Sequence, residues 1–360
     1  MTKAELDSIK ILPLEDSWYR KVKEKLDGIA KPLDGLGKFE HLIAQIGAIE
    51  KTTQISIQKK AVLVMCADNG VVEEQVSQSG KEVTLAVAKA MGVNNSSVGK
   101  MAAVAGVDVI PVDIGIDTDE LIPGVLPRKV AKGTKNFAKE PAMTEEEVLK
   151  AIETGIQLVQ QCHREGYEIL ATGEMGIGNT TTSTAVAAAL LDLAVEQVTG
   201  KGAGLTDEAL KRKCRVIKEA IEKYSLRDAD AFTILKTVGG LDIAGLTGVF
   251  IGAAIEQIPV VIDGVISAVA ALLAETLCKG AVNYMIPSHK SRELAETAIM
   301  KKLHLDPVLD ADMALGEGTG AVMMMSLLDV ALGVYLQGAS FANFEIEQYK
   351  RYCLLYTSPS

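Results

Sequence analysis

The sequence predicts an α/β protein, a three-layer α/β/α sandwich around a mostly parallel sheet. Two observations carry this prediction. Short apolar runs recur along the chain, and they are nearly continuous, which is typical of strands buried on both faces. Longer stretches with a helical pattern separate these runs, and such an alternation predicts βαβ units and hence parallel strands.

Each predicted strand ends in polar or glycine residues. In open parallel sheets, ligands bind outside the carboxyl ends of the strands, so these residues are candidates for a site. The strands are expected at residues 61–66, 107–112, 168–171, 258–262 and 281–286. The helices are expected at residues 81–105, 144–164, 180–193, 207–223, 240–257 and 264–279.

The N-terminal residues 12–46 have a mostly helical pattern that one loop interrupts. Pro32, Gly35 and Gly37 require a turn there, and the apolar residues from Phe39 onward fit one face of a helix. The loop either joins two helices and does nothing more, or it contributes backbone to a ligand pocket.

A carboxylate lies between glycines in Leu315-Gly316-Glu317-Gly318-Thr319-Gly320, just before an apolar run. Closely spaced glycines cost backbone entropy, so they indicate a place where the chain approaches a ligand or takes positive φ. Glu317 is therefore a candidate general base. The alternative is a solvated glutamate that caps the helix after a glycine-rich turn.

The stretch from Gly173 to Thr182 has the same design, with Glu174 beside a glycine loop. Asn179 or Thr180 is expected to begin a helix, and the amides of a helix N-terminus suit a phosphate. The pattern is neither a Walker A motif nor GxGxxG. An ordinary helix cap is the alternative.

A second possible phosphate cradle is Gly200-Lys201-Gly202-Ala203-Gly204, before a helix that Thr206 or Asp207 would cap. Lys213 in that helix either supplies a cation or is solvated. In Ser288-His289-Lys290-Ser291, His289 is a possible base, although helix capping by either serine is the commoner role. No second histidine has metal-ligand spacing, so no metal site is predicted.

Composition limits the classes of function. The 360 residues are 48% hydrophobic, the net charge is −10 and no basic block is present, so nucleic acid is not an expected partner. The five cysteines lack CxxC spacing, which favours a reducing compartment. Without a signal-like N-terminus or an uncharged run of about 18 residues, we expect a cytoplasmic protein with no membrane span. Residues 353–360 read as a non-native cloning scar.

Taken together, these motifs resemble the nicotinate-nucleotide–dimethylbenzimidazole phosphoribosyltransferase family of cobalamin lower-ligand synthesis. The resemblance runs from about residue 26 to about residue 344. Besides the stretches quoted above, it includes Lys31-Pro32 with Gly35-Leu36-Gly37-Lys38-Phe39-Glu40, Ala67-Asp68-Asn69-Gly70-Val71, Gly133-Thr134-Lys135-Asn136, Pro141-Ala142-Met143 and Asp263-Gly264.

The resemblance implies that nicotinate mononucleotide gives its phosphoribosyl group to 5,6-dimethylbenzimidazole or a related base, without cofactor or metal. It implies Glu317 as the base that deprotonates the acceptor, and Glu174 as a second carboxylate that assists or replaces it. The other residues that it implies are Gly176, Gly178, Asn179 and Thr180 for the nucleotide, Gly202, Gly204, Lys213 and Ser291 for the phosphate, and Leu315, Ser79 and Gly80 for the acceptor base.

The resemblance also implies a homodimer in which the partner subunit completes the active site. It implies a large domain at residues 61–328 and a small helical domain built from both termini, residues 1–60 with 329–352.

This chain departs from the commoner family pattern at several positions. Asn69 replaces a histidine, Ala203 replaces a threonine, and Ala295-Glu296 replaces a Gly-His pair. Residues 33–37 and 79–81 differ as well. These departures bear on which base is the acceptor. The alternative function is a non-catalytic, nucleotide-binding regulatory or carrier protein on the same fold.

Overall fold

The computed structural model describes residues 1–200, 202 and 204–351. The chain divides into two compact units. The larger comprises Met1–Pro13 and Ile57–Ser326, and the smaller comprises Leu14–Ser56 with the chain from Leu327. Residues 352–360, which include the suspected cloning scar, lie outside the described residues.

The N-terminal segment belongs to the larger unit, whereas the sequence analysis assigned it to the small domain. The amino group of Met1 pairs with Glu153 at 2.7 Å, and the hydroxyl of Tyr284 donates to the Leu12 carbonyl oxygen at 2.9 Å. Leu6, on helix α1 (Lys3–Ser8), is fully buried. These contacts hold Met1–Pro13 against the larger unit, and a helical pattern alone does not reveal them.

The larger unit contains a six-stranded sheet in the order β3-β2-β1-β4-β5-β6. Every pairing in it is parallel, and helices cover both faces, so the α/β prediction is confirmed. All eight residues of β1 are buried, as its continuous apolar run predicts. The strands are β1 (Lys60–Ala67), β2 (Val107–Gly115), β3 (Leu126–Pro127), β4 (Ile169–Met175), β5 (Val260–Ile262) and β6 (Met285–Pro287).

The strand predicted at residues 281–286 is wrong in its first part. Ala281–Tyr284 form a 3₁₀ turn, and β6 begins only at Met285. Strand β3 was not predicted, because two residues are too few to show any periodicity.

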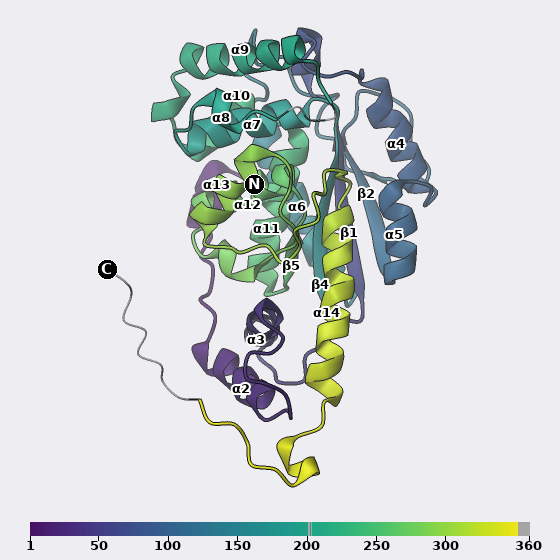
Figure 1. Ribbon diagram of the computed structural model, residues 1–360. Helices are drawn as coiled ribbons and strands as arrows, with labels where there is room; N and C mark the ends of the chain where they lie inside the picture. Colours follow the sequence, from purple (N-terminus) through teal and green to yellow (C-terminus); the bar gives the residue numbers. More distant parts are fainter. Residues whose placement is uncertain (201, 203, 352–360) are drawn as a thin grey trace, which may run out of the picture. The chain divides into compact units, whose positions relative to one another are not determined.

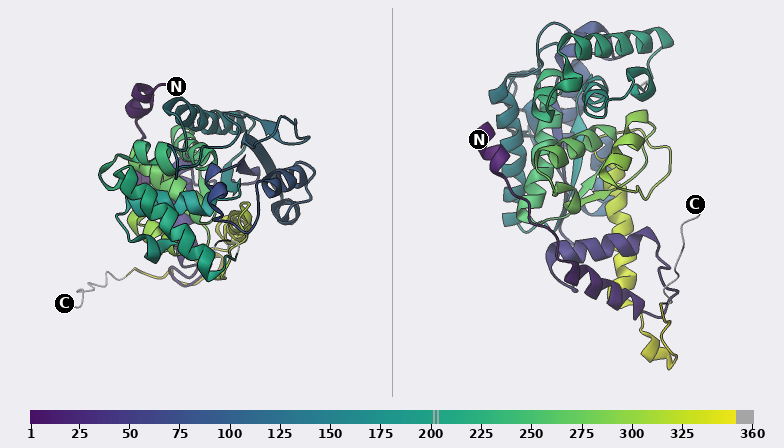
Figure 2. Two further views of the ribbon diagram at one scale, coloured as in Figure 1. Left: turned by 90° about the horizontal axis from the view of Figure 1, so that it is seen from above. Right: turned by 90° about the vertical axis from the view of Figure 1, so that its left-hand side faces the viewer.

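Two layers of helices enclose the sheet (Figure 1; Figure 2). Helices α4 and α5 pack on β2, and α11 packs on β1 and β4 from the other face together with α6 and α12. The helices of the larger unit are α4 (Glu82–Gly92), α5 (Ser97–Ala105), α6 (Glu145–Arg164), α7 (Asn179–Leu190), α8 (Val195–Val198), α9 (Asp207–Lys223), α10 (Ala231–Val238), α11 (Leu241–Glu256), α12 (Val265–Leu277) and α13 (Leu294–Leu303).

The helix predicted at residues 81–105 is two helices. Asn94 has a φ of +53°, and the hydroxyl of Ser96 accepts a hydrogen bond from the Gly99 amide as the N-cap of α5. A left-handed residue followed by a new cap ends one helix and begins the next. This break gives α5 its own N-terminus, which matters at the site described below.

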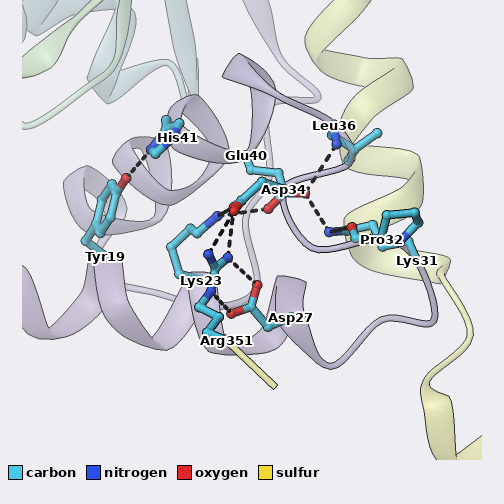
Figure 3. A network of polar contacts seen from close by, with 10 residues as sticks. All are labelled: Tyr19, Lys23, Asp27, Lys31, Pro32, Asp34, Leu36, Glu40, His41 and Arg351. Carbon is cyan, nitrogen blue, oxygen red and sulfur yellow. Dashed lines mark hydrogen bonds and ion pairs between the residues drawn. The ribbon is translucent and has the colours of Figure 1, made fainter. Parts of the chain in front are cut away.

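The smaller unit contains α2 (Asp16–Asp27), α3 (Lys38–Glu50) and the last part of α14 (Thr319–Gln337). A fully buried carboxylate, Glu40, orders its loop (Figure 3). Glu40 accepts from Nζ of Lys23 at 2.8 Å, from Nζ of Lys31 at 2.5 Å and from the Leu36 amide at 3.3 Å. Burial opposes ionisation of Glu40, but these donors hold its pKa below the usual range.

The same network joins the C-terminal segment to this unit (Figure 3). The guanidinium of Arg351 donates to the carboxylates of both Asp27 and Asp34. Asp27, Asp34 and Glu40 lie close enough to hold a cation. Because Lys23, Lys31 and Arg351 already balance these three charges, we assign no metal to them.

Helix α14 is long and apolar enough to cross a membrane by length and composition. It is one such helix among the described residues, and 56% of its most apolar window is buried. A core helix of a folded protein has the same composition, so this feature does not indicate a membrane span.

Candidate active site

A cavity of about 290 Å³ opens at the carboxyl ends of β4, β5 and β6. Glu174 reaches it from the end of β4, Asp263 follows β5 and His289 follows β6. Glu317 lines it from the loop before α14. The cavity lies beside the point where the strand order reverses, between β1 and β4, which is where such sheets bind ligands.

Two glycines bring the two predicted carboxylates together. A Cβ atom on Gly173 would lie 2.5 Å from the Glu317 carbonyl oxygen, and one on Gly318 would lie 3.2 Å from the Gly173 Cα. The backbones of β4 and the Glu317 loop can approach this closely only without side chains. Glu174 and Glu317 therefore line one cavity.

Glu317 is partly exposed and has a φ of +61°. Its Oε2 accepts a hydrogen bond from the Val98 amide at 3.0 Å, in the first turn of α5. A helix N-terminus favours an anionic partner because its amides point outward. The carboxylate is thus held at the cavity wall and not in open solvent.

Glu174 has the opposite environment. It is buried, and Nδ2 of Asn179 donates to its carboxylate. Burial raises its pKa to about 8, with further contributions from Asp242 and Asp263, while the bond from Asn179 opposes the shift. At neutral pH Glu174 is therefore mostly protonated.

The predicted nucleotide loop lies against the same cavity. Gly176, Asn179 and Thr180 line it, and α7 begins at Asn179. Gly178 is the N-cap, with a φ of +93° that favours glycine, and it lines an adjoining cavity of about 80 Å³. The local structure is the loop and helix N-terminus that suits an anion.

Lys213 is fully buried, which excludes the alternative of a solvated lysine on the helix surface. Its Nζ donates to the Thr180 hydroxyl at 2.9 Å and to the Gly200 carbonyl oxygen at 3.3 Å. Burial lowers its pKa to about 8, and the Glu293 carboxylate opposes this shift. Lys213 thus reaches the cavity through Thr180.

Of the remaining residues predicted to bind the phosphate, some line the cavity and one does not. Gly202 and Ser291 line the cavity, and the Gly202 amide donates to Glu293 Oε1 at 3.2 Å. Gly204 is not among the lining residues, and its carbonyl oxygen accepts from Gln78. Lys201 and Ala203, with the threonine-to-alanine departure, lie outside the described residues.

The acceptor candidates divide as well. Leu315 lines the cavity with 54% of its surface exposed, and Val265 adds a second apolar wall. Ser79 and Gly80 line neither this cavity nor the adjoining one, where Ser77 and Gln78 lie instead. The structure therefore does not bring Ser79 and Gly80 to the carboxylates.

The sequence analysis placed Asp263 after a predicted strand and in one motif of the family resemblance, without a role, yet it is buried and lines the cavity. Its carboxylate accepts from the amides of Gly318 at 3.2 Å and Ala321 at 3.0 Å. His289 is also buried against the cavity, and burial lowers its pKa. The signal for both was a polar residue just after an apolar strand: Asp263 directly follows β5, and His289 lies two residues after β6.

Two residues at which this chain departs from the commoner family pattern form hydrogen bonds to the loops that line the cavity. Asn69 donates from Nδ2 to the Ile177 carbonyl oxygen at 3.3 Å. Glu296 accepts from the Ser291 amide, and burial raises its pKa to about 8. Neither residue is among those that line the cavity.

Comparison with known proteins agrees with this geometry. A family model described as "Phosphoribosyltransferase" matches residues 11–346. A relative from Clostridium acetobutylicum, named nicotinate-nucleotide–dimethylbenzimidazole phosphoribosyltransferase, is 44% identical over 94% of this chain and 96% of its own. A relative of the same name from Acetivibrio thermocellus is 45% identical over 91% and 94%.

A solved structure of CobT from Thermus thermophilus superposes with a TM-score of 0.87 at 33% identity. The match covers 92% of this chain and all of that one. The fold, the site and these relatives define a phosphoribosyltransferase, an enzyme that moves a ribose phosphate between partners. The chain belongs to the nicotinate-nucleotide–dimethylbenzimidazole phosphoribosyltransferase family.

Proposed function

We propose that this enzyme transfers the phosphoribosyl group of nicotinate mononucleotide to 5,6-dimethylbenzimidazole or a related base. The products are α-ribazole 5′-phosphate and nicotinate, for the nucleotide loop of cobalamin. The observation that carries the proposal is the pair of carboxylates, Glu174 and Glu317, in one cavity beside a helix N-terminus that suits a phosphate.

The reaction requires the removal of one proton from the acceptor base. The bond between the nicotinate nitrogen and the anomeric carbon breaks, and its electron pair neutralises the pyridinium. A nitrogen of the benzimidazole forms the new bond from the opposite face, which inverts the anomeric carbon. The proton on the other benzimidazole nitrogen passes to Glu317, so positive charge does not build up on the acceptor.

Glu174 takes a different role. Because it is buried and protonated at neutral pH, it donates a hydrogen bond to an oxygen of the ribose. Asn179 fixes its orientation from the first turn of α7. Holding both substrates in line contributes at least as much as proton transfer.

The phosphate binds at the amide groups around Gly176, Gly178, Asn179 and Thr180. Gly202 and Ser291 line the same cavity. Lys213 supplies the balancing charge through its contact with Thr180. The acceptor packs on Leu315, and Ser79, Gly80 and Gly204 take part only if their loops move toward the cavity.

The enzyme works as a homodimer. The apolar side chains of Met323, Val330 and Val334 are spaced along one face of α14, and each is more than a third exposed. Such a stripe is costly to leave in water and suits a second copy of the chain. We place the enzyme in the cytoplasm and expect no metal or cofactor requirement. Analytical ultracentrifugation tests whether the protein is a dimer. Turnover measured in the presence of a chelator tests the expectation that no metal is required.

The test of function is a product assay. Purified protein is mixed with nicotinate mononucleotide and an equimolar panel of 5,6-dimethylbenzimidazole, benzimidazole, adenine and p-cresol, and the products are identified by mass spectrometry. An α-ribotide from wild type and not from Glu317→Gln supports the proposal. Nicotinate mononucleotide that is bound but never consumed would support the non-catalytic carrier instead.

A further inference from the structure

We propose that Asp263 is a positioning residue, whose carboxylate holds the glycine-flanked loop of Glu317 and so sets the place of the base in the cavity. This inference rests on the proposed role of Glu317. Asp263 acts on the reaction through that loop and not by contact with the reacting atoms.

Two hydrogen bonds join the Asp263 carboxylate to the chain around the base, and His289 lies near enough to interact with its charge. Its Oδ2 accepts from the Gly318 amide at 3.2 Å, directly after Glu317, and its Oδ1 accepts from the Ala321 amide at 3.0 Å. These amides lie on either side of the residues where α14 begins. One buried carboxylate from the end of β5 thus caps α14 and fixes the last residue of the base's turn.

The Glu317 loop needs such a constraint. Glu317 has a φ of +61°, between Gly316 at +84° and Gly318 at +93°. A non-glycine residue in the left-handed region is uncommon, and it persists where the surrounding structure over-determines it. Asp263 constrains the loop on one side, and the contact between Gly173 and Gly318 constrains it on the other.

Asp263 is itself held in place. Its amide donates to the Ser267 hydroxyl at 3.2 Å, and its carbonyl oxygen accepts from the Ser288 hydroxyl at 3.1 Å. The backbone of Asp263 is therefore tied to α12 and to the residue after β6, both parts of the larger unit. Both of its carboxylate oxygens accept from amides at the start of α14, so the carboxylate faces the loop that carries Glu317.

The test is a double-mutant cycle of Asp263→Asn and Glu317→Gln, with kcat and KM measured at equal substrate concentrations. The substitution turns one oxygen into an NH₂ group, which then faces one of the loop amides. We expect Asp263→Asn alone to lower kcat about 10- to 100-fold, while KM for nicotinate mononucleotide changes less than about threefold. In the Glu317→Gln background it causes no further loss, because the base it positions is already absent.

A matched control separates positioning from capping in general. Asp230 accepts from the Thr233 amide at 2.8 Å as the N-cap of α10 and does not line the cavity. Asp230→Asn is expected to lower thermal stability and leave kcat unchanged. If Asp263→Asn does not fold, Asp263→Ser, which keeps one capping oxygen, is measured in the same cycle and interpreted in the same way.

Two outcomes overturn the inference. In one, Asp263 variants keep the wild-type kcat. In the other, they lose the same factor with and without the Glu317 carboxylate, which means that Asp263 acts independently of the base. Failure of the proposed function looks different, since wild type itself would then bind nicotinate mononucleotide without forming an α-ribotide. A base other than Glu317 would show as Glu317→Gln with the wild-type kcat.

Discussion

The Glu174 loop and the Glu317 loop have the same pattern in sequence and opposite environments in the fold. Each has a carboxylate beside glycines and before a helix. Glu174 is the second-last residue of a central strand, buried among Asp242, Asp263 and Asn179. Glu317 lies on a turn at the cavity wall, with its carboxylate at the N-terminus of α5.

The difference shows that a sequence motif identifies a candidate carboxylate, whereas the burial of that carboxylate determines its role in the reaction. Burial keeps the proton on Glu174, whereas the carboxylate of Glu317 is partly exposed and accepts a hydrogen bond from the Val98 amide. Two carboxyl groups with separated environments are the usual arrangement for a division into acid and base.

The largest expected effect is that of Glu317→Gln. It removes the proton acceptor and keeps the shape, so kcat should fall at least about 100-fold with no change in thermal unfolding. Glu208→Gln, an exposed position in the first turn of α9, is the matched control. Full turnover in Glu317→Gln would assign the proton to another group.

Gly173→Ala should come next, because it separates the two loops without touching either carboxylate. The added Cβ would lie 2.5 Å from the Glu317 carbonyl oxygen, so the loop must shift. A displacement of about 1 Å can cost about 100-fold in rate, and we expect a loss of about 10- to 100-fold in kcat. Gly28→Ala, where the nearest atom is 3.4 Å away, is the control that should retain activity.

Lys213→Met should act on the nucleotide and not on the carboxylates. Met fills a similar space without the charge, so KM for nicotinate mononucleotide should rise about tenfold while KM for the acceptor changes little. Lys211→Met, an exposed residue on the same helix, serves as the comparison. Equal rises in both Michaelis constants would remove Lys213 from the phosphate site.

Glu174→Gln should have the smallest effect at pH 7, because a glutamine resembles a protonated glutamate. We expect a loss of less than about tenfold at pH 7. Wild-type activity should decline as the pH rises through about 8, where Glu174 ionises, and this decline should be smaller in the variant, in which Lys213 still loses its charge near that pH. A loss as large as that of Glu317→Gln would contradict the division of roles.

The raised pKa of Glu174 also predicts how the free energy of unfolding changes with pH. Because the folded-state pKa of Glu174 is raised to about 8 from an ordinary 4.5, its contribution is fully present below pH 4.5 and is lost as the pH rises through 8. Urea unfolding of wild type and Glu174→Gln across this range should show a flatter dependence in the variant. Glu296 contributes in the same direction, so some dependence will remain.

Much of the sheet was predictable, because apolar runs buried on both faces are recorded in single stretches of chain. The runs at residues 61–66 and 107–112 lie within β1 and β2. Where contacts between distant segments determine the local structure, the pattern of apolar residues did not predict it. Ala281–Tyr284 are as apolar as a strand, yet they form a turn, and Met1–Pro13 are anchored by residues far along the chain.

The sequence by itself determined the family, the two glycine loops and the candidate carboxylates, because these depend on residue types at short spacing. Only the tertiary structure decided which carboxylate is buried, that Lys213 is enclosed, and that Ser79 and Gly80 lie away from the cavity. It also decided that Asp263 holds the Glu317 loop from 54 residues earlier in the chain. The physical reason is that protonation and positioning depend on neighbours in space, and a linear pattern does not contain them.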